Sequence, residues 1–261
     1  MKIERFFILF ISILLWECAD ARSNETFANS GVCITDLYTK KDTLTLIDSS
    51  RNRVIPIATY NVVNSAPRNI KKKLVIFNPG YGSKSTDYGY IATNLSANGY
   101  FVIVIQHDLP TDDTLPRLGD IYKLRRAVWD RGVKSIFFVT DQLKKKYPQL
   151  DYDHIILMGH SNGGDMAMLI ANEYPSFAKV VITLDNRRVA IPRADHPKIF
   201  SIRSSDQPAD AGVLPAPEEQ KRYKIKIVKV NTIHNDMGGR GTQAQKKETN
   251  LLIMDFLNSA R

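Results

Sequence analysis

The stretch IILMGHSNGG, residues 155–164, decides the fold of this chain. Its first four residues form an apolar run typical of a buried strand, and residues 166–174 have the pattern of a helix that stops before Pro175. A serine on such a sharp strand-to-helix turn is held in a strained conformation with its hydroxyl exposed. Only small side chains fit two positions before and after it, as Gly159 and Gly163 do around Ser161. The stretch therefore predicts a nucleophilic serine at a helix N-terminus, where a developing anion is stabilised.

Strand and helix patterns alternate on both sides of this turn. Short apolar, β-branched runs lie at 74–78, 101–106, 180–184, 199–202 and 225–230, with helical patterns at 88–98, 115–147 and 242–258. This alternation predicts an α/β fold with a mostly parallel central sheet and helices on both faces. Residues 43–60 are expected to add antiparallel strands at one edge, joined by a turn at 48–52.

Length and composition fit one globular domain. The chain has 261 residues, of which 43% are hydrophobic and 24% charged, and these values exclude disordered, collagen-like and disulfide-rich classes. Residues 1–21 have a basic start, an 11-residue apolar run at 6–16 and an Ala-x-Ala ending at Ala21, the pattern of a cleaved export signal. An uncleaved anchor is the weaker alternative. We expect a secreted or periplasmic domain over 22–261, without stable membrane insertion, because no later segment is apolar enough to span a bilayer.

Four motifs carry a resemblance to a known superfamily. They are Asp48-x-x-Arg51-x-Arg53, Asn78-Pro79-Gly80-Tyr81-Gly82, the serine turn, and His234-x-Asp236-Met237. From about Thr45 to the C-terminus the chain resembles α/β-hydrolases, within them the branch of dienelactone hydrolases, platelet-activating-factor acetylhydrolase-like enzymes, chlorophyllases and cutinase-like esterases. The resemblance implies a serine hydrolase that cleaves carboxylic esters through an acyl-enzyme, with its catalytic residues in the order serine, acid, histidine.

This order leaves few candidates for the histidine and the acid. Of the two histidines after Ser161, His196 precedes a strand, whereas His234 follows the last strand at the carboxyl edge where ligands bind in such sheets, so His234 is the expected general base. Asp206, after the run 199–202, is the expected acid. Asp185, at the end of the preceding strand, is the alternative, and Asp210 is a third candidate.

An oxyanion hole needs two donors. One is expected to be the backbone N–H of Asn162, directly after the serine. The resemblance places the other at the backbone N–H of Tyr81. Related enzymes often carry His-Gly-x-Gly in this loop, and here Pro79 replaces the histidine, which puts the bracing of the loop in question.

The substrate side is expected to be open. Only 11 residues, 186–196, lie between the strand 180–184 with Asp185 and Pro197, too few for a large cap domain, so an accessible small-molecule or polymeric ester is favoured. The net charge of +9 does not by itself indicate a binding partner. The arginines on this edge could favour an anionic substrate, although solvent-facing charge is the simpler interpretation; they are Arg187, Arg188, Arg193 and Arg203.

Other functions receive less support from the sequence. The lysine runs lack interleaved aromatic residues, so no nucleic-acid partner is expected. Neither metal-ligand spacing nor a glycine-rich phosphate loop is present, so no metal or other cofactor is expected. A peptidase or amidase using the same residues, and a non-catalytic binding protein with this fold, remain alternatives.

Overall fold

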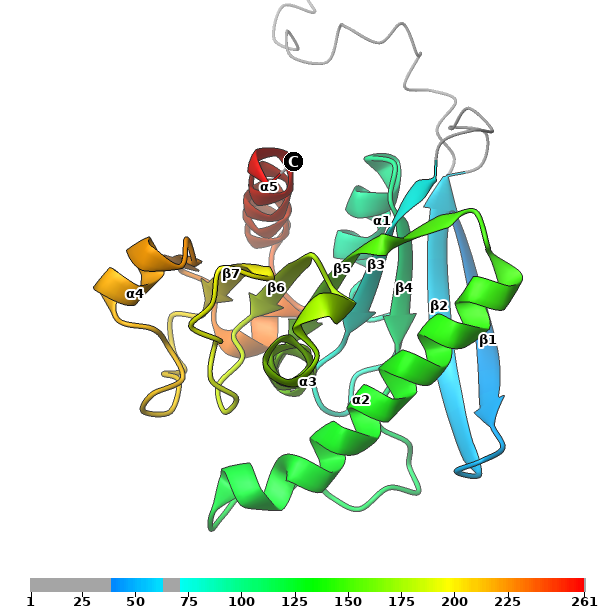
Figure 1. Cartoon of the computed structure of the whole chain (residues 1–261), viewed down its shortest axis with the longest axis horizontal. Helices are drawn as coiled ribbons and strands as arrows, with labels where there is room; N and C mark the ends of the chain where they lie inside the picture. Colours follow the sequence, from blue (N-terminus) through cyan, green and yellow to red (C-terminus); the bar gives the residue numbers. More distant parts are fainter. Residues whose placement is uncertain (1–38, 63–70, 261) are drawn as a thin grey trace, which may run out of the picture. The chain divides into compact units, whose positions relative to one another are not determined.

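In the computed structural model, residues 39–62 and 71–260 are described, and they belong to one compact unit, Leu37–Arg261. The expected export signal at 1–21 lies outside the described residues. Figure 1 shows a twisted sheet with helices packed on its two faces. The strands are β1 (Thr39–Asp48), β2 (Arg53–Val62), β3 (Lys72–Asn78), β4 (Phe101–Ile105), β5 (Leu150–His160), β6 (Val180–Leu184), β7 (Lys198–Arg203) and β8 (Lys226–Lys229).

The sheet has the strand order β1-β2-β4-β3-β5-β6-β7-β8. The pairs β1–β2 and β2–β4 are antiparallel, and every pair from β4 to β8 is parallel. The predicted mostly parallel sheet with an antiparallel edge is therefore confirmed. Parallel strands in this order bring the loops after β3, β5, β6, β7 and β8 to one edge of the sheet, where ligands bind in such folds.

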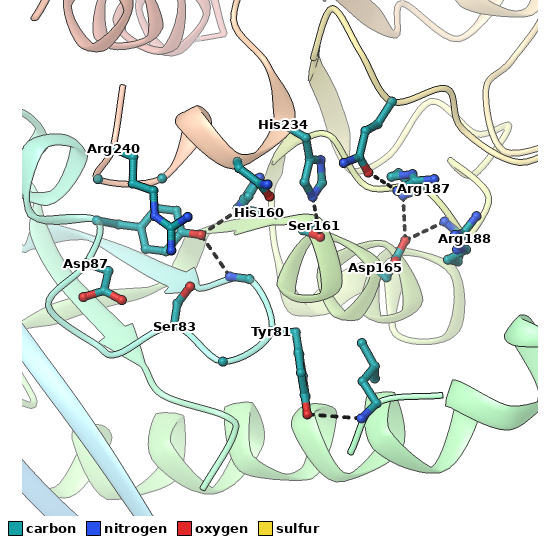
Figure 2. A pocket seen from close by; sticks show the side chains of 18 of the residues that line it. Tyr81, Ser83, Asp87, His160, Ser161, Asp165, Arg187, Arg188, His234 and Arg240 are labelled. Carbon is teal, nitrogen blue, oxygen red and sulfur yellow. Dashed lines mark hydrogen bonds between the residues drawn. The ribbon is translucent and has the colours of Figure 1, made fainter. Parts of the chain in front are cut away.

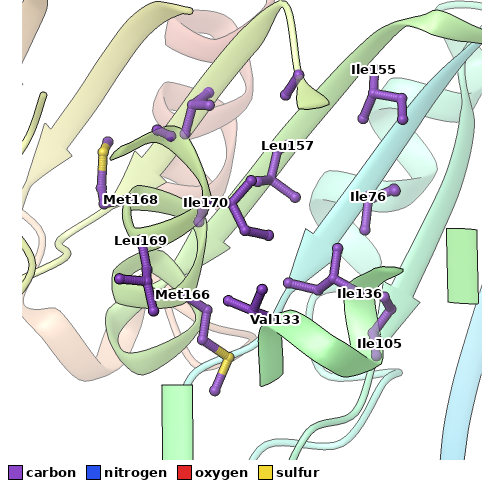
Figure 3. Packing of buried hydrophobic residues seen from close by; sticks show 14 of the residues in the cluster. Ile76, Ile105, Val133, Ile136, Ile155, Leu157, Met166, Met168, Leu169 and Ile170 are labelled. Carbon is purple, nitrogen blue, oxygen red and sulfur yellow. The ribbon is translucent and has the colours of Figure 1, made fainter. Parts of the chain in front are cut away.

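Two hydrophobic clusters fill the spaces between the sheet and its helices. On one face, side chains of α2 (Ile121–Lys146) and α3 (Ser161–Glu173) pack against the strands. Figure 3 shows Met166 and Ile170 of α3 beside Leu157 of β5 and Val133 of α2. On the other face, α1 (Gly89–Ala97) and α5 (Gln243–Ser259) cover the sheet. Strands buried on both faces explain the nearly continuous apolar runs in the sequence.

The hairpin at the sheet edge explains the first motif. The Asp48 carboxylate accepts hydrogen bonds from the Ser50 hydroxyl and from Arg51 Nε at 2.6 Å each, which fixes the turn between β1 and β2. Arg53 forms a bidentate ion pair with Asp112 at 2.8 and 2.9 Å and donates to the carbonyl of His107. The hairpin thus holds the loop after β4, which runs toward the site described below.

The long helix begins later than the sequence pattern suggested. It starts at Ile121 rather than near residue 115, because the Asp120 side chain accepts from the Lys123 N–H and caps its N-terminus. Residues before Asp120 remain a loop. The short helix α4 (Pro217–Arg222) was not predicted. Residues 185–197 between β6 and β7 contain neither helix nor strand, so the expected absence of a large cap in this connection is confirmed.

Candidate active site

Ser161 lies at the junction of β5 and α3. Its backbone is left-handed, with φ +52°, a conformation that costs energy for a residue with a side chain. A Cβ atom on Gly159 would lie 2.3 Å from the Gly163 carbonyl oxygen, and one on Gly163 would lie 2.1 Å from the carbonyl oxygen of Asn78. The two glycines are therefore required by close backbone approach. The helix begins at Ser161 itself, five residues before the helical pattern in the sequence.

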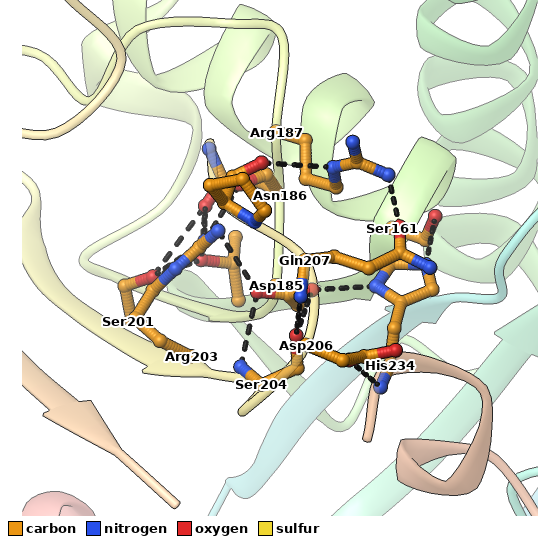
Figure 4. A network of polar contacts seen from close by, with 12 residues as sticks. Ser161, Asp185, Asn186, Arg187, Ser201, Arg203, Ser204, Asp206, Gln207 and His234 are labelled. Atoms are coloured by element: carbon orange, nitrogen blue, oxygen red, sulfur yellow. Dashed lines mark hydrogen bonds and ion pairs between the residues drawn. The ribbon is translucent and has the colours of Figure 1, made fainter. Parts of the chain in front are cut away.

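Three side chains at the carboxyl edge of the sheet are hydrogen-bonded in series. The Ser161 Oγ lies 2.9 Å from His234 Nε2, and His234 Nδ1 lies 2.5 Å from Asp185 Oδ2 (Figure 4). Because an ionised carboxylate only accepts hydrogen bonds, Nδ1 donates to Asp185, which leaves Nε2 as the acceptor for the serine hydroxyl. This is the arrangement in which a histidine can remove the proton of a serine.

Asp185 is held rigidly for this role. It ends β6 with φ +57° and is fully buried, and its carboxylate also accepts from the backbone N–H and the hydroxyl of Ser204 at 3.1 and 2.7 Å. Arg203 forms an ion pair with it at 2.8 Å. Burial raises the pKa of Asp185, but the hydrogen bond from His234, the charge of Arg203 and the bonds from Ser204 outweigh this effect and lower it overall. The carboxylate therefore stays ionised beside the imidazole.

The structure does not place Asp206 where the sequence prediction put it. Asp206 is exposed, and its Oδ1 accepts from the backbone N–H of His234 at 2.7 Å rather than from the imidazole. Asp185 occupies the position expected for Asp206. The physical reason is the register of the sheet, which pairs His160 of β5 with Leu184 of β6, so the residue after β6 is one strand away from the serine turn. Asp210, the third candidate, pairs instead with Arg188.

The loop after β3 is braced by a tyrosine and a histidine. The backbone N–H of Gly80 donates to Tyr88 Oη at 3.1 Å, and this hydroxyl lies 2.6 Å from His160 Nδ1. Burial, and secondarily the charge of His234, lower the pKa of His160 to about 3, so its ring is neutral and Nδ1 can accept from the tyrosine. No pattern in the sequence signals this pair, because Tyr88 and His160 are 72 residues apart. Pro79 had put the bracing of this loop in question. The Tyr88 hydroxyl, held by His160 at the end of β5, supplies that bracing.

Neither expected oxyanion donor has a competing acceptor within residues 39–62 and 71–260. Tyr81 lies outside the helices and strands, and its backbone N–H donates to no group among the described residues. The N–H of Asn162 belongs to the first turn of α3, where amides have no partner within the helix. The Asn162 side chain is fixed by the indole N–H of Trp129, which donates to its Oδ1 at 2.8 Å. Sequence reasoning had not singled out Trp129.

A pocket of about 850 Å³ opens in front of Ser161 and is lined mainly by polar residues. Figure 2 shows Ser161 and His234 between Arg240 on one side and Arg187 with Arg188 on the other. The loop that carries Arg187 and Arg188 is tied to α3, because Asp165 Oδ1 accepts the backbone N–H groups of residues 187, 188 and 189 at 2.9 to 3.1 Å. The hydroxyl of Tyr81 accepts from the Leu115 N–H at 3.1 Å. This bond connects the loop after β3 to the loop before α2, and both loops line the pocket.

The described residues contain neither a metal-binding cluster nor a membrane-spanning helix. No group of three or more histidine, cysteine, aspartate or glutamate side chains in residues 39–62 and 71–260 could hold a metal ion. No helix in the same ranges is long and apolar enough to cross a membrane.

Comparison with known proteins agrees with this architecture. A family model described as serine aminopeptidase, S33, matches residues 69–184, a range that includes Ser161 and stops before Asp185 and His234. None of the curated proteins matches the sequence.

Several solved esterases share the fold at low sequence identity. The hyperthermophilic esterase from the archaeon Pyrobaculum calidifontis has a TM-score of 0.61 at 13% identity, covering 87% of this chain and 85% of its own. A fungal esterase from Rhizomucor miehei has a TM-score of 0.59 at 9% identity, covering 86% and 84%. A ferulic acid esterase from Streptomyces cinnamoneus has a TM-score of 0.50 at 18% identity, covering 77% and 74%. The chain has the α/β-hydrolase fold.

Proposed function

We propose that this protein is a serine hydrolase of carboxylic esters, in which Ser161 is the nucleophile, His234 the general base and Asp185 the acid. The observation that carries the proposal is the continuous hydrogen-bonded series from Ser161 Oγ through the His234 ring to Asp185, at 2.9 and 2.5 Å. The left-handed backbone of Ser161 supports it, because a strained residue at the start of a helix is typical of a nucleophile turn.

The reaction would proceed in two halves. His234 Nε2 takes the proton of Ser161 as Oγ attacks the ester carbonyl, and the negative charge on the carbonyl oxygen is held by the backbone N–H groups of Tyr81 and Asn162. The imidazolium then gives the proton to the departing alcohol, which leaves an acyl-enzyme. In the second half His234 activates a water molecule, the carboxylic acid departs, and Ser161 regains its proton.

A fluorophosphonate probe tests the nucleophile directly, because it reacts with an activated serine without needing the right substrate. We expect the probe to label the folded protein at Ser161 and to leave Ser161→Ala unlabelled. The same preparations are assayed with 4-nitrophenyl esters of two to twelve carbons. Folded native protein that neither reacts with the probe nor turns over any of these esters would exclude the proposal and would favour a non-catalytic binding protein with this fold.

An aminopeptidase is the second candidate, because the matching family model is described as a serine aminopeptidase. An aminopeptidase must bind the positively charged α-amino group of its substrate, for which a carboxylate is the natural partner. Among the described residues that line the pocket near Ser161, five are arginines, among them Arg187 and Arg188, and only Asp87 and Asp165 are carboxylic acids. This charge favours an ester without a free amine. Faster cleavage of aminoacyl-4-nitroanilides than of 4-nitrophenyl esters would reverse the ranking.

Export of the protein belongs to the same proposal. Its support is the sequence pattern at 1–21, with an apolar run that ends before Ala19-Asp20-Ala21. Expression of the full chain with N-terminal sequencing of the product tests it. We expect a mature chain that begins near Arg22, outside the cytoplasm.

A further inference from the structure

Four arginines from three separate parts of the chain line one end of the pocket in front of Ser161. Arg117 lies in the loop before α2, Arg125 in the first turns of α2, and Arg187 with Arg188 in the loop after β6. The charges of Arg188, Arg187 and Arg117 all contribute to lowering the pKa of Arg125, after burial as the main cause. Four guanidinium groups are thus concentrated at one site, although their positions in the sequence are up to 71 apart.

Few carboxylates offset this charge. Arg188 pairs with Asp210, and Asp165 lines the same pocket, so in the described part of the chain two carboxylates accompany the four guanidinium groups at this end. Asp87, the other carboxylate that lines the pocket, lies on the side of Arg240 (Figure 2). One Asp165 oxygen is already engaged by three backbone N–H groups, and burial raises the pKa of this carboxyl to about 6. An excess of positive charge therefore remains at this end of the pocket.

The polar contacts of the arginines leave donors free for a ligand. Arg187 donates to the neutral acceptors Gln207 Oε1 and Pro208 O, and Arg125 Nε donates to the Pro116 carbonyl at 2.8 Å. Within residues 39–62 and 71–260, neither guanidinium forms an ion pair with a carboxylate, and neither does that of Arg117. The Nε of Arg188 is buried without a hydrogen-bond partner in the same part of the chain. Guanidinium groups with free donors in a concave site bind carboxylate and phosphate oxygens bidentately.

The other two arginines that the sequence placed near this edge serve different purposes. Arg203 is buried beneath Asp185, and Arg193 binds Glu219 and the carbonyls of residues 191, 212, 213 and 214. Neither lines the pocket. The cluster that faces the serine is therefore Arg117, Arg125, Arg187 and Arg188, called here the arginine cluster.

We propose that the arginine cluster binds an anionic group of the substrate, a carboxylate or a phosphate, while Ser161 attacks the ester bond. This inference rests on the proposed hydrolase function and names its substrate class: an ester that carries a negative charge within reach of Ser161. An anion at this end would complete the bidentate contacts that Arg125 and Arg187 lack, and the positive potential would also draw anionic substrates into the pocket.

Matched ester pairs test the proposal with activity. In the first pair the charge lies on the acyl group: mono-4-nitrophenyl adipate is compared with 4-nitrophenyl hexanoate. In the second pair the charge lies on the alcohol group: 4-acetoxybenzoate is compared with 4-acetoxybenzamide. A 4-nitrophenyl ester of 6-phosphonohexanoate compares a phosphonate with the carboxylate. We expect kcat/KM to favour the anionic member of at least one pair by about tenfold or more, as charge-assisted hydrogen bonds of ordinary strength would give. The preference should shrink between 50 and 500 mM salt.

Substitutions locate the effect on the arginine cluster. The double variant Arg125→Gln, Arg187→Gln should lose most of the preference for the anionic ester, measured as the ratio of kcat/KM between the two members of each pair. Arg193→Gln removes one guanidinium from the loop that also carries Arg187, but this guanidinium does not line the pocket, so the variant should keep the preference. Equal rates for both members of each pair in an active native protein would overturn the proposal, as would a preference that the double variant retains.

Binding measurements separate this inference from the proposed hydrolysis. On Ser161→Ala, titration calorimetry compares the unreactive amides adipic acid mono-anilide with hexananilide, and 4-acetamidobenzoate with 4-acetamidobenzamide. Tighter binding of an anionic member, lost in the double arginine background, supports the anion site even if no ester is turned over. Turnover of neutral esters combined with no charge preference in binding would retain the hydrolase proposal and refute the anion site.

Discussion

Asp185 Oδ2 lies 2.5 Å from the Nδ1 atom of His234, on the opposite side of the ring from Ser161. Asp206 reaches the same residue but bonds its backbone N–H, at 2.7 Å. A carboxylate at Nδ1 selects the tautomer that leaves Nε2 free to accept a proton, and it stabilises the imidazolium that follows. A carboxylate at the backbone positions the loop but cannot influence the ring in this way.

Exchange of each acid for its amide separates the two roles. Asp185→Asn should lower kcat on 4-nitrophenyl esters by about 10³- to 10⁴-fold, because the amide removes the charge and permits the wrong tautomer. Asp206→Asn keeps an oxygen that can accept the His234 N–H, so we expect less than about a tenfold loss. Near-ultraviolet circular dichroism of both variants checks that they remain folded. A severe loss confined to Asp206→Asn would show that our assignment of the acid is wrong.

Removal of the Tyr88 hydroxyl should weaken the oxyanion loop. Tyr88→Phe leaves the Gly80 N–H and His160 Nδ1 without their shared partner, and an unsatisfied buried group costs about 1–3 kcal/mol. We expect kcat to fall about tenfold or more with a smaller change in KM, since the loop carries the Tyr81 donor, which acts on the transition state. Single-turnover acylation rates measure this effect.

The matched control for Tyr88→Phe is Tyr152→Phe. This hydroxyl also makes a hydrogen bond, to the Tyr147 carbonyl at 3.0 Å, but it lies near the start of β5, at the opposite end of that strand from Ser161. It should cost some stability and leave kcat unchanged. Equal losses of kcat in both variants would mean that the effect reports general destabilisation rather than loop bracing.

Gly163→Ala should destabilise the whole fold. The added Cβ would lie 2.1 and 2.3 Å from the carbonyl oxygens of Asn78 and Pro79, so the helix and the end of β3 would have to separate. We expect the free energy of unfolding to drop by about 3 kcal/mol or more, measured by urea denaturation. Gly89→Ala is the comparison, because its Cβ meets only the Tyr60 hydroxyl at 3.5 Å; the free energy of unfolding should change by less than about 1 kcal/mol.

Two buried neutral histidines should make the protein sensitive to acid. Burial lowers the pKa of both His107 and His160 from 6.5 to about 3, with positive charges nearby as a secondary cause. Between these values the unfolded chain binds two protons that the folded one does not, so stability falls as the pH drops from about 6.5 towards 3. Their combined contribution is about 3 kcal/mol per pH unit at most.

Urea midpoints at pH 7, 6, 5 and 4 measure this dependence. The double variant His107→Asn, His160→Asn should start from a lower stability at pH 7 and lose less of it on acidification, and each single variant should fall between the double variant and the native protein. Parallel pH profiles for the native and double-variant proteins would contradict the assignment of the acid sensitivity to these two rings.

The sequence by itself determined the fold and two members of the candidate site. Apolar runs alternating with helical patterns specified the parallel sheet, because strands buried on both faces must be apolar throughout. The glycines around Ser161 identified the turn, since close backbone approach excludes any side chain there. The position of His234 after the last strand brought it to the same edge. These features are local, and a pattern of neighbouring residues is sufficient to find them.

The tertiary structure alone decided what depends on the distance between remote residues. Asp185 and Asp206 both follow a strand at the same edge, and only the register of β5 with β6 brings the Asp185 carboxylate to the His234 ring. The brace from Tyr88 to His160 crosses the site from a loop to the end of β5. The arginine cluster joins the start of α2 to the loop after β6, and no spacing in the sequence signals such a meeting, because it arises from how helices and strands pack in three dimensions.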